Sequence, residues 1–294
     1  MTKRHGILFG VAAYGLWGVL PLYWKWLQGV PALEILAHRV AWSFLFLGVL
    51  LLVGGGFSGL RHAMADRRAW LINACAGLLI GINWLTYIWG VNANRIVETS
   101  LGYYINPLVS VVLGVVFLRE RLRPRQWLAV GLAAMAVGYL TLRRGEVPWV
   151  AVVLASSFSV YGLMKKLSPL SALYGLIVET GLLVVPALVY LGALGHSGEG
   201  AFGVAPPAIS GLLGFTGVVT ALPLLLFAAA ARRVALSTLG LLQYLSPTCS
   251  LLIGIGVYRE SFGQDRLIAF ALIWIALGLY GWESRCARSR TPAP

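Results

Sequence analysis

Ten apolar stretches, each long enough to form a membrane-spanning helix, follow one another along the chain with short polar connections between them. About 20 apolar residues suffice to cross the hydrocarbon core of a bilayer. With 59% hydrophobic and 11% charged residues, the chain has too little polar surface to cover a soluble globule. We therefore expect an all-α polytopic membrane protein. The ten transmembrane helices are expected near 5–27, 32–54, 70–92, 97–118, 124–142, 147–166, 169–192, 208–231, 236–257 and 265–283.

Part of the sequence occurs nearly twice, which indicates an internal duplication. The segment TSLGYYINPLVSVVLGVVFLRER begins at Thr99, and its echo STLGLLQYLSPTCSLLIGIGVYRES begins at Ser237. The prolines of the two segments, Pro107 and Pro247, are 140 residues apart. Each half should then hold five helices, and an odd number of spans inverts the second copy relative to the first. The expected repeats are 1–143 and 144–294, the second ending in a short basic tail.

The net charge of +13 is explained by the distribution of Lys and Arg among the connections. With the N-terminus inside, sixteen of the 23 basic residues fall on the cytoplasmic side, six on the other side, and Arg39 within a helix. This asymmetry follows the positive-inside rule and predicts that the N- and C-termini are both cytoplasmic. The excess of basic residues is thus attributed to membrane insertion and to contacts with anionic lipid headgroups, and no nucleic acid is expected as a partner.

Inverted repeats commonly build alternating-access transporters that bind their substrate near the bilayer midplane. Aromatic side chains can hold an apolar or aromatic part of a solute, and amides and phenols can bind its polar end. Pro107 and Pro247 are expected to kink their helices and to free a backbone carbonyl four residues earlier. Tyr103 and Gln243 are expected on opposite walls. The candidate substrate-binding residues are Tyr14, Trp17, Asn83, Tyr87, Tyr103, Asn106, Tyr161, Gln243 and Tyr244.

Ionisable side chains within the spans need a partner or water. His38 and Arg39 suggest a buried polar network, and Glu34, which shares a face with His38, either joins it or lies in water at the helix mouth. Glu179 lies 140 residues after Arg39, so the duplication raises the hypothesis that the two pair. The candidates for a polar network or for proton coupling are His38, Arg39, Glu98 and Glu179.

Motifs of membrane-embedded enzymes, such as HExxH, GxSxG or paired mid-span carboxylates, do not occur in the sequence. We therefore expect no enzyme, no catalytic residue, no cofactor and no metal site. Cys75, Cys249 and Cys286 lack metal-like spacing and are interpreted as small apolar residues. The stretch 195–207 is rich in Gly and Pro and is expected to form an exposed linker.

Several segments together resemble the RarD group of the EamA family, within the drug/metabolite transporter superfamily. They include AAYGLWGVLPLYWK, EILAHRVAWSF, NWLTYIWGVNANRIVETSLGYYINPLVSVVLGVVFLRERL and TLGLLQYLSPTCSLLIGIGVYRE, and the resemblance covers essentially the whole chain. It implies two five-helix EamA repeats, cytoplasmic termini, and a central cavity lined chiefly by the first, third, fourth, sixth, eighth and ninth helices. It also implies a multi-pass permease of the bacterial inner membrane. Structurally similar members of the superfamily export amino acids, including aromatic ones.

We accordingly predict a permease or exporter of small organic metabolites, with amino acids as the favoured class, that works by rocking of the two halves. A multidrug exporter and a non-transporting accessory protein are the alternatives. The expected partners are a small-molecule substrate and the lipid bilayer. A monomer would suffice, although the sequence leaves the oligomeric state open. Facilitated exchange or uniport is preferred to proton coupling, because the interiors of the transmembrane spans contain no Asp, Asp265 being the first residue of the last span, and Glu98 lies close to an interface.

Overall fold

The computed structural model describes residues 3–54, 56, 59–61, 65–118, 124–231 and 242–289, with the side chains of a few helical residues left out. Every regular element in these ranges is a helix, as expected from the long apolar stretches. The helices of twelve or more residues are α1 (Lys3–Trp26), α2 (Ala32–Val53), α4 (Arg67–Asn92), α5 (Ile96–Leu118), α6 (Pro124–Arg144), α7 (Trp149–Leu167), α8 (Ala172–Ser197), α9 (Pro207–Ala231), α11 (Leu245–Gly256) and α12 (Gln264–Ser289).

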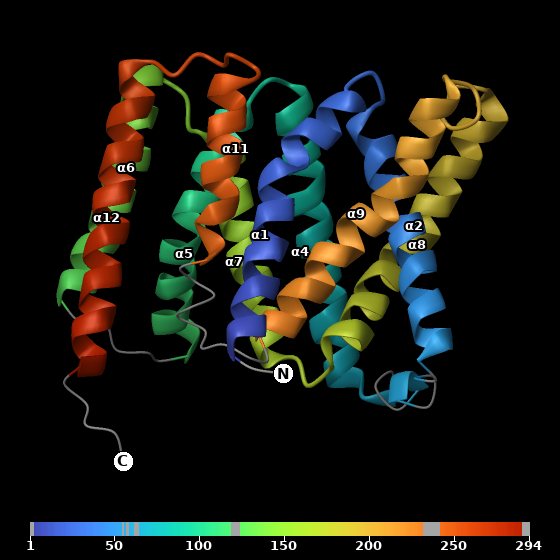
Figure 1. The fold of residues 1–294 in the computed structure, drawn as a ribbon, viewed down its shortest axis with the longest axis horizontal. Coiled ribbons are helices and arrows are strands. Elements are labelled where there is room, and N and C mark those ends of the chain that lie inside the picture. Colours follow the sequence, from blue (N-terminus) through green and yellow to red (C-terminus); the bar gives the residue numbers. More distant parts are fainter. Residues whose placement is uncertain are drawn as a thin grey trace.

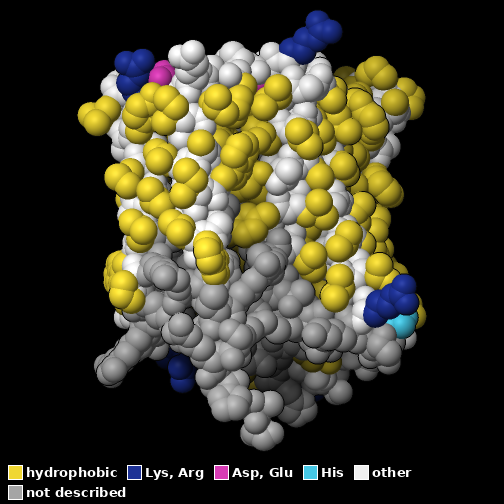
Figure 2. Space-filling view, turned by 60° about the vertical axis from the view of Figure 1, so that its left-hand side comes forward, with side chains coloured by type: hydrophobic (Ala, Val, Ile, Leu, Met, Phe, Trp, Pro, Cys, Tyr) yellow, Lys and Arg dark blue, Asp and Glu magenta, His cyan; other side chains and the backbone are white. Residues whose placement is uncertain are grey.

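The helices run alternately up and down through one bundle (Figure 1). Of the described helices, α1, α2, α4, α5, α8 and α9 are long and apolar enough to cross a membrane, and α6, α7 and α11 contain shorter apolar stretches. Hydrophobic side chains cover the middle of the face in Figure 2, while charged side chains lie near its upper and lower edges. The chain is therefore an all-helical polytopic membrane protein, as predicted.

Three helix ends differ from the expected ones by about five residues or more, and one of them is the end of α12, which lies at Ser289 instead of near 283. The helix expected at 169–192 begins only at Ala172, because Ser171 accepts a hydrogen bond from the Tyr174 N–H and caps it, and it continues to Ser197. Gly198 ends it in the left-handed conformation, with φ 72°. Of the helix expected at 236–257, residues 236–241 lie outside the described ranges, and α11 begins at Leu245, after a turn at Tyr244.

Helices of the first half pack mainly on helices of the second. The contacting pairs include α2 with α8 and α9, α4 with α7 and α8, α1 with α9 and α11, α5 with α7 and α11, and α6 with α12. Glycines allow some of these close approaches, because a Cβ at Gly217 would lie 2.5 Å from the backbone carbonyl carbon of Trp42. A Cβ at Gly77 would lie 3.1 Å from the Cα of Glu179.

One end of the bundle is closed by polar contacts above a layer of buried apolar side chains. Glu260 accepts hydrogen bonds from the backbone N–H groups of Ile96 and Val97, at 2.8 and 2.9 Å, and so caps the start of α5. Lys25 donates to Asn94 at 2.5 Å. The layer beneath consists of fully buried side chains: Trp24, Leu27, Ile35, Ile88, Val91 and Ile96. Polar contacts and a layer of buried apolar side chains thus cover this end of the bundle.

Candidate functional site

A cavity lies in the middle of the bundle, among α1, α2, α4, α5, α7, α9 and residues 243–247 at the start of α11. The space between its walls, together with the open space at its mouth, amounts to about 680 Å³. Its walls are mostly apolar and aromatic. They are formed by Tyr14, Trp17, Leu20, Arg39, Ile80, Asn83, Trp84, Tyr87, Tyr103, Phe158, Leu224, Gln243, Ser246 and Pro247.

Six of the nine candidate substrate-binding residues lie on this wall, namely Tyr14, Trp17, Asn83, Tyr87, Tyr103 and Gln243. The other three are not among the lining residues. Asn106 lies behind Gln243, whose amide donates to the Asn106 Oδ1 at 3.0 Å. Tyr161 donates its hydroxyl to Glu179, and the Tyr244 ring stacks on Tyr104 with centroids 6.3 Å apart. A role of Asn106, Tyr161 or Tyr244 in binding would therefore have to be indirect in this conformation.

The aromatic lining forms two groups. Tyr14 and Trp17 meet edge to face on α1, with ring centroids 5.5 Å apart, and both contact Phe227 of α9. On the opposite side Tyr87 of α4 and Tyr103 of α5 meet edge to face at 5.7 Å. Such contacts fix the ring orientations, so the cavity presents preformed aromatic surfaces to a solute.

Two amides that were expected to bind substrate are engaged in helix packing instead. The Asn83 amide donates to the Leu154 carbonyl at 3.1 Å and to the Ser157 hydroxyl at 3.0 Å. Its Oδ1 accepts the Tyr103 hydroxyl at 3.0 Å. Asn83 thereby holds α4 on α7. Its two N–H donors are used, and only one lone pair of Oδ1 is left over.

Asn106 makes equivalent contacts from the next helix, α5. Its amide donates to the Ala155 carbonyl at 3.1 Å and to the Ser159 hydroxyl at 2.8 Å. The Ser159 hydroxyl in turn donates to the Asn106 carbonyl at 3.0 Å. Two serines of α7 therefore bind neighbouring helices, Ser157 through Asn83 of α4 and Ser159 through Asn106 of α5.

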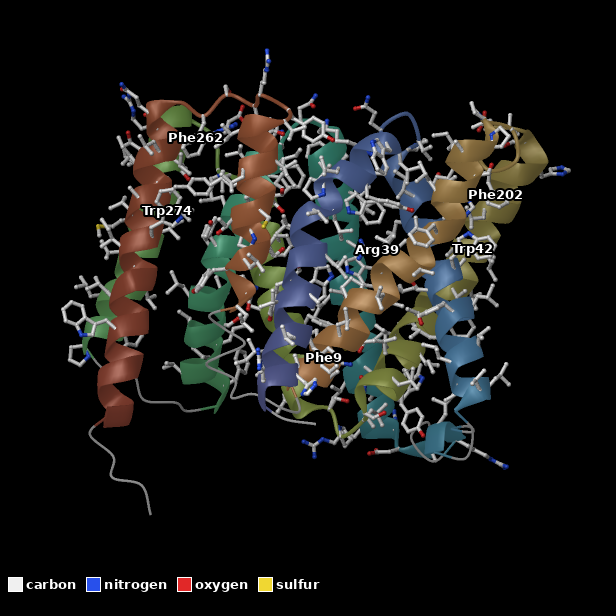
Figure 3. The ribbon with its side chains drawn as sticks, in the orientation of Figure 1. Phe9, Arg39, Trp42, Phe202, Phe262 and Trp274 are labelled. Carbon is white, nitrogen blue, oxygen red and sulfur yellow. The ribbon has the colours of Figure 1, made fainter. Side chains whose placement is uncertain are left out.

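Among the described residues that line the cavity, Arg39 is the only charged one. It is 3% exposed, and its Nε and Nη1 have no hydrogen-bond acceptor among the residues that the structure describes. Its guanidinium lies 4.1 Å from the ring centre of Trp84 and 5.1 Å from that of Trp24. Figure 3 places Arg39 inside the bundle. Two indole faces thus stabilise the cation, and no carboxylate of a described residue does.

Glu34 and His38 tie α2 to the connection between α8 and α9. Glu34 Oε1 accepts the Ala201 N–H at 2.7 Å and lies 4.0 Å from His38 Nε2. The His38 ring packs on Phe202, with centroids 5.0 Å apart, and Trp42 adds a further ring contact (Figure 3). The segment 195–207 is mostly exposed, as expected, and its backbone is anchored at Ala201 by the buried Glu34 carboxylate.

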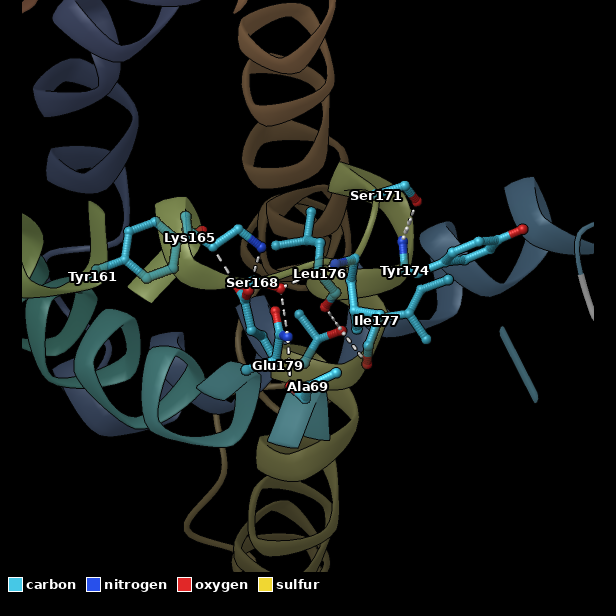
Figure 4. Close-up of polar contacts among 12 residues, drawn as sticks. Ala69, Tyr161, Lys165, Ser168, Ser171, Tyr174, Leu176, Ile177 and Glu179 are labelled. Atoms are coloured by element: carbon cyan, nitrogen blue, oxygen red, sulfur yellow. Dashed lines mark hydrogen bonds and ion pairs between the residues drawn. The ribbon is translucent and has the colours of Figure 1, made fainter. Parts of the chain in front are cut away.

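Glu179 pairs with Lys165, and the hypothesis that it pairs with Arg39 is wrong. Lys165 Nζ lies 2.6 Å from Glu179 Oε1, and the Tyr161 hydroxyl donates to Oε2 at 3.2 Å (Figure 4). Glu98 has a different partner again, Arg95, whose Nη1 lies 3.4 Å from Glu98 Oε2. The four ionisable candidates therefore do not form one network.

The two prolines lie in different settings. Pro247 is the third residue of α11, where its missing N–H is not needed by the helix, and it lines the cavity. Pro107 lies within α5, and its side chain is outside the described part of the structure.

Several lining residues were missed by sequence reasoning. Ile80 and Trp84 share one face of α4 with the predicted residues Asn83 and Tyr87, and this helical spacing was a signal available from the sequence. Nothing local distinguishes Leu20, Phe158 or Leu224 from other apolar residues. Arg39 was assigned to a network because the sequence does not reveal which side of α2 faces a cavity.

A polytopic helical bundle with a preformed aromatic cavity at its centre has the architecture of a small-solute transporter. Residues 4–142 match the EamA-like transporter family. The chain is 46% identical to an uncharacterized transporter of Pseudomonas aeruginosa, over 99% of this chain and 98% of that one. It is 43% identical to the protein RarD of Escherichia coli, over 98% and 97% of the two chains. The chain belongs to the EamA-like transporter family.

A solved structure supports the same fold. A crystal structure of a protein 21% identical in sequence superposes with a TM-score of 0.63, covering 95% of this chain and 98% of the other. At this identity the likeness concerns the arrangement of the helices and not the solute.

Proposed function

We propose that the protein is an inner-membrane permease that exports small organic metabolites, with amino acids, including aromatic ones, as the favoured class. The observation that carries the proposal is the central cavity, whose aromatic groups and few polar atoms suit a small amphipathic solute. The transporter names of the relatives support a permease. The amino-acid class rests on the chemistry of the cavity wall and on the family resemblance.

Alternating access between two inverted repeats, 1–143 and 144–294, is the proposed mechanism. If the two repeats are related by an axis, each helix of the first has a counterpart in the second: α1 corresponds to α7, α2 to α8, α4 to α9, and α5 to α11. The contact between α1 and α9 then corresponds to the contact between α7 and α4. In the same way, the contact between α2 and α9 corresponds to the contact between α8 and α4. All four contacts are present in the structure. In Figure 1, α1 and α7 also begin at opposite ends of the bundle. These contacts support a pseudo-two-fold axis between the halves.

The proposed orientation places the end where α1 begins in the cytoplasm. Arg4, Arg61, Arg67 and Arg68 lie toward that end, and an excess of positive charge marks the cytoplasmic side. The opposite end, where Glu260 caps α5, then faces the periplasm. The structure would accordingly correspond to a state closed to the outside.

Counterflow in proteoliposomes tests the proposed function. Purified protein is compared with empty liposomes for uptake of labelled phenylalanine, leucine and threonine. We expect saturable uptake in which these amino acids compete, and a loss of about tenfold in Trp17→Ala, because an aromatic wall is removed. The matched control is Trp127→Ala, a half-exposed tryptophan on the outer surface of α6, which should leave uptake unchanged.

Failure of all three amino acids would overturn the favoured substrate class. If a hydrophobic cationic drug moved instead, the protein would be a multidrug exporter. If nothing in a broad panel of metabolites and drugs moved faster than in empty liposomes, the accessory-protein alternative would replace the permease.

A further inference from the structure

On the basis of the function proposed above, we infer that Arg39 is the anion-recognising residue of the cavity and that the transported solute carries a carboxylate. The Arg39 guanidinium, held against the Trp24 and Trp84 rings, would bind that carboxylate directly. This assigns Arg39 to substrate binding and sets the substrate class by its acidic group.

The position of Arg39 makes a structural role costly. It lies seven residues after the first residue of α2, about 10 Å along the helix axis, and is 3% exposed. Its Nε and Nη1 find no acceptor in the described part of the chain. A buried cation without an anionic partner destabilises a membrane protein, because neither water nor a counter-ion offsets its lost hydration. An incoming anion would supply the missing partner.

The chain's own carboxylates near the membrane interior have other partners, although the Glu34 Oε2 has none among the described residues. Glu34 accepts the Ala201 N–H at 2.7 Å, Glu98 pairs with Arg95 at 3.4 Å, and Glu179 pairs with Lys165 at 2.6 Å. No Asp or Glu is found among the residues that line the cavity as described. The described wall of the cavity therefore carries one positive charge and no negative one.

The two indoles prepare the guanidinium for a planar anion. Contacts at 4.1 Å to the centre of the Trp84 ring and at 5.1 Å to that of the Trp24 ring restrict its motion without using its N–H donors. A guanidinium presents these donors as a fork in its own plane, which matches the two oxygens of a carboxylate. Restricting the side chain beforehand also lowers the entropy lost on binding.

The rest of the wall suits the body of an amphipathic acid. Tyr14 and Trp17 offer ring faces to an apolar or aromatic group, and the ammonium of an amino acid can be accommodated against the same faces. A hydrophobic cation without an acidic group meets like charge at Arg39 instead. The inference therefore separates an exporter of acids or zwitterions from a multidrug exporter of cations.

Ligand-induced thermal shifts of the purified protein in detergent test the inference. The probes are L-phenylalanine, L-phenylalaninamide, which lacks the carboxylate, and 3-phenylpropionate, which lacks the ammonium. We expect the wild type to bind the two acids about tenfold or more tightly than the amide. In Arg39→Gln this preference should fall to about one, and Arg39→Lys should retain part of it because it keeps the charge.

Ligand-free stability separates binding from a structural role. Replacing an unpaired buried cation by a neutral group should leave the thermal midpoint of Arg39→Gln equal to or above that of the wild type. A clearly lower midpoint in both Arg39→Gln and Arg39→Met would mean that Arg39 holds the fold together, and the inference would be overturned.

The remaining outcomes are also decisive. Equal binding of acid and amide by the wild type, or an unchanged preference in Arg39→Gln, refutes the role of Arg39 even if amino acids are transported. Binding of 3-phenylpropionate that depends on Arg39, with no binding or transport of any amino acid, upholds the role of Arg39 and refutes the amino-acid proposal. Absence of binding by every acid refutes the inference.

Discussion

Lys165 and Glu179 form a buried ion pair between α7 and α8, with Nζ 2.6 Å from Oε1. Glu179 is 1% exposed at its side chain and Lys165 26%. The space around the pair is tight, because a Cβ at Gly175 would lie 2.5 Å from the Lys165 Nζ. The pair neutralises the carboxylate in the second turn of α8, so Glu179 has a structural partner, and it is not among the residues that line the cavity.

Removing one partner of this pair should destabilise the protein. We expect Lys165→Met to lower the free energy of unfolding by about 2 kcal/mol, because it leaves a buried carboxylate unpaired while the exposed part of Lys165 limits the loss. The double variant Lys165→Met, Glu179→Leu should recover most of it. Arg143→Met is the matched control, since its pair with Asp265 is largely exposed and should matter little. Thermal unfolding in detergent measures all three, and a double variant as unstable as the single one would contradict this account.

The Glu260 carboxylate should hold the closed end of the bundle. It accepts two N–H groups at the start of α5, where the positive end of the helix dipole also favours a carboxylate. We expect Glu260→Ala to lower the free energy of unfolding by about 1–2 kcal/mol, measured by thermal unfolding. Glu199→Ala, in an exposed connection, serves as the control. Equal stability of the two variants would show that the cap contributes nothing.

Gly217 should be intolerant of any side chain. Its Cβ would lie 2.5 Å from the carbonyl carbon and oxygen of Trp42, so Gly217→Ala must push α9 away from α2. We expect a loss of about 1–3 kcal/mol in stability. Gly162→Ala in α7 is the matched control, because nothing lies within 4 Å of its Cβ position, and it should stabilise the helix by up to about 1 kcal/mol. Similar midpoints for both variants would be inconsistent with the packing described.

Transport should not depend on a proton gradient. The described cavity wall carries no carboxylate and no histidine, and Glu179 is tied to Lys165 outside the wall. Proton coupling requires a titratable group that is exposed alternately to the two sides of the membrane. We expect the same counterflow rate in proteoliposomes with and without an imposed pH gradient. Strict dependence of the rate on the gradient would overturn this prediction and would return Glu179 and His38 to consideration as proton carriers.

The helices could be predicted from the sequence because bilayer thickness fixes their length, and the apolar stretches satisfy it one after another. Tyr87 and Tyr103 were both expected to line a binding site, and both lie on the wall of the cavity. Such local patterns locate a cavity reasonably well. They do not reveal which polar atoms remain free inside it.

The partners of the buried polar groups could not be predicted. Lys165 lies at the end of the helix expected at 147–166 and is one of the sixteen basic residues counted as cytoplasmic, but its long side chain reaches back to Glu179. Asn83 was expected to bind substrate, but the serine hydroxyl of a neighbouring helix takes one of its donors. Both outcomes depend on how α4, α7 and α8 face each other, and that geometry arises from tertiary packing.

The most direct test is whether the cavity opens in turn to both sides of the membrane. In a background without the three native cysteines, Ser246→Cys would be treated with a membrane-impermeant thiol reagent in spheroplasts and in inside-out vesicles. Ser246 lines the cavity, whereas Leu252→Cys on the exposed face of α11 provides a lipid-facing control. We predict that Ser246→Cys is modified from either side, and that Leu252→Cys is modified from neither. Modification of Ser246→Cys from one side only, with and without added phenylalanine, would contradict alternating access.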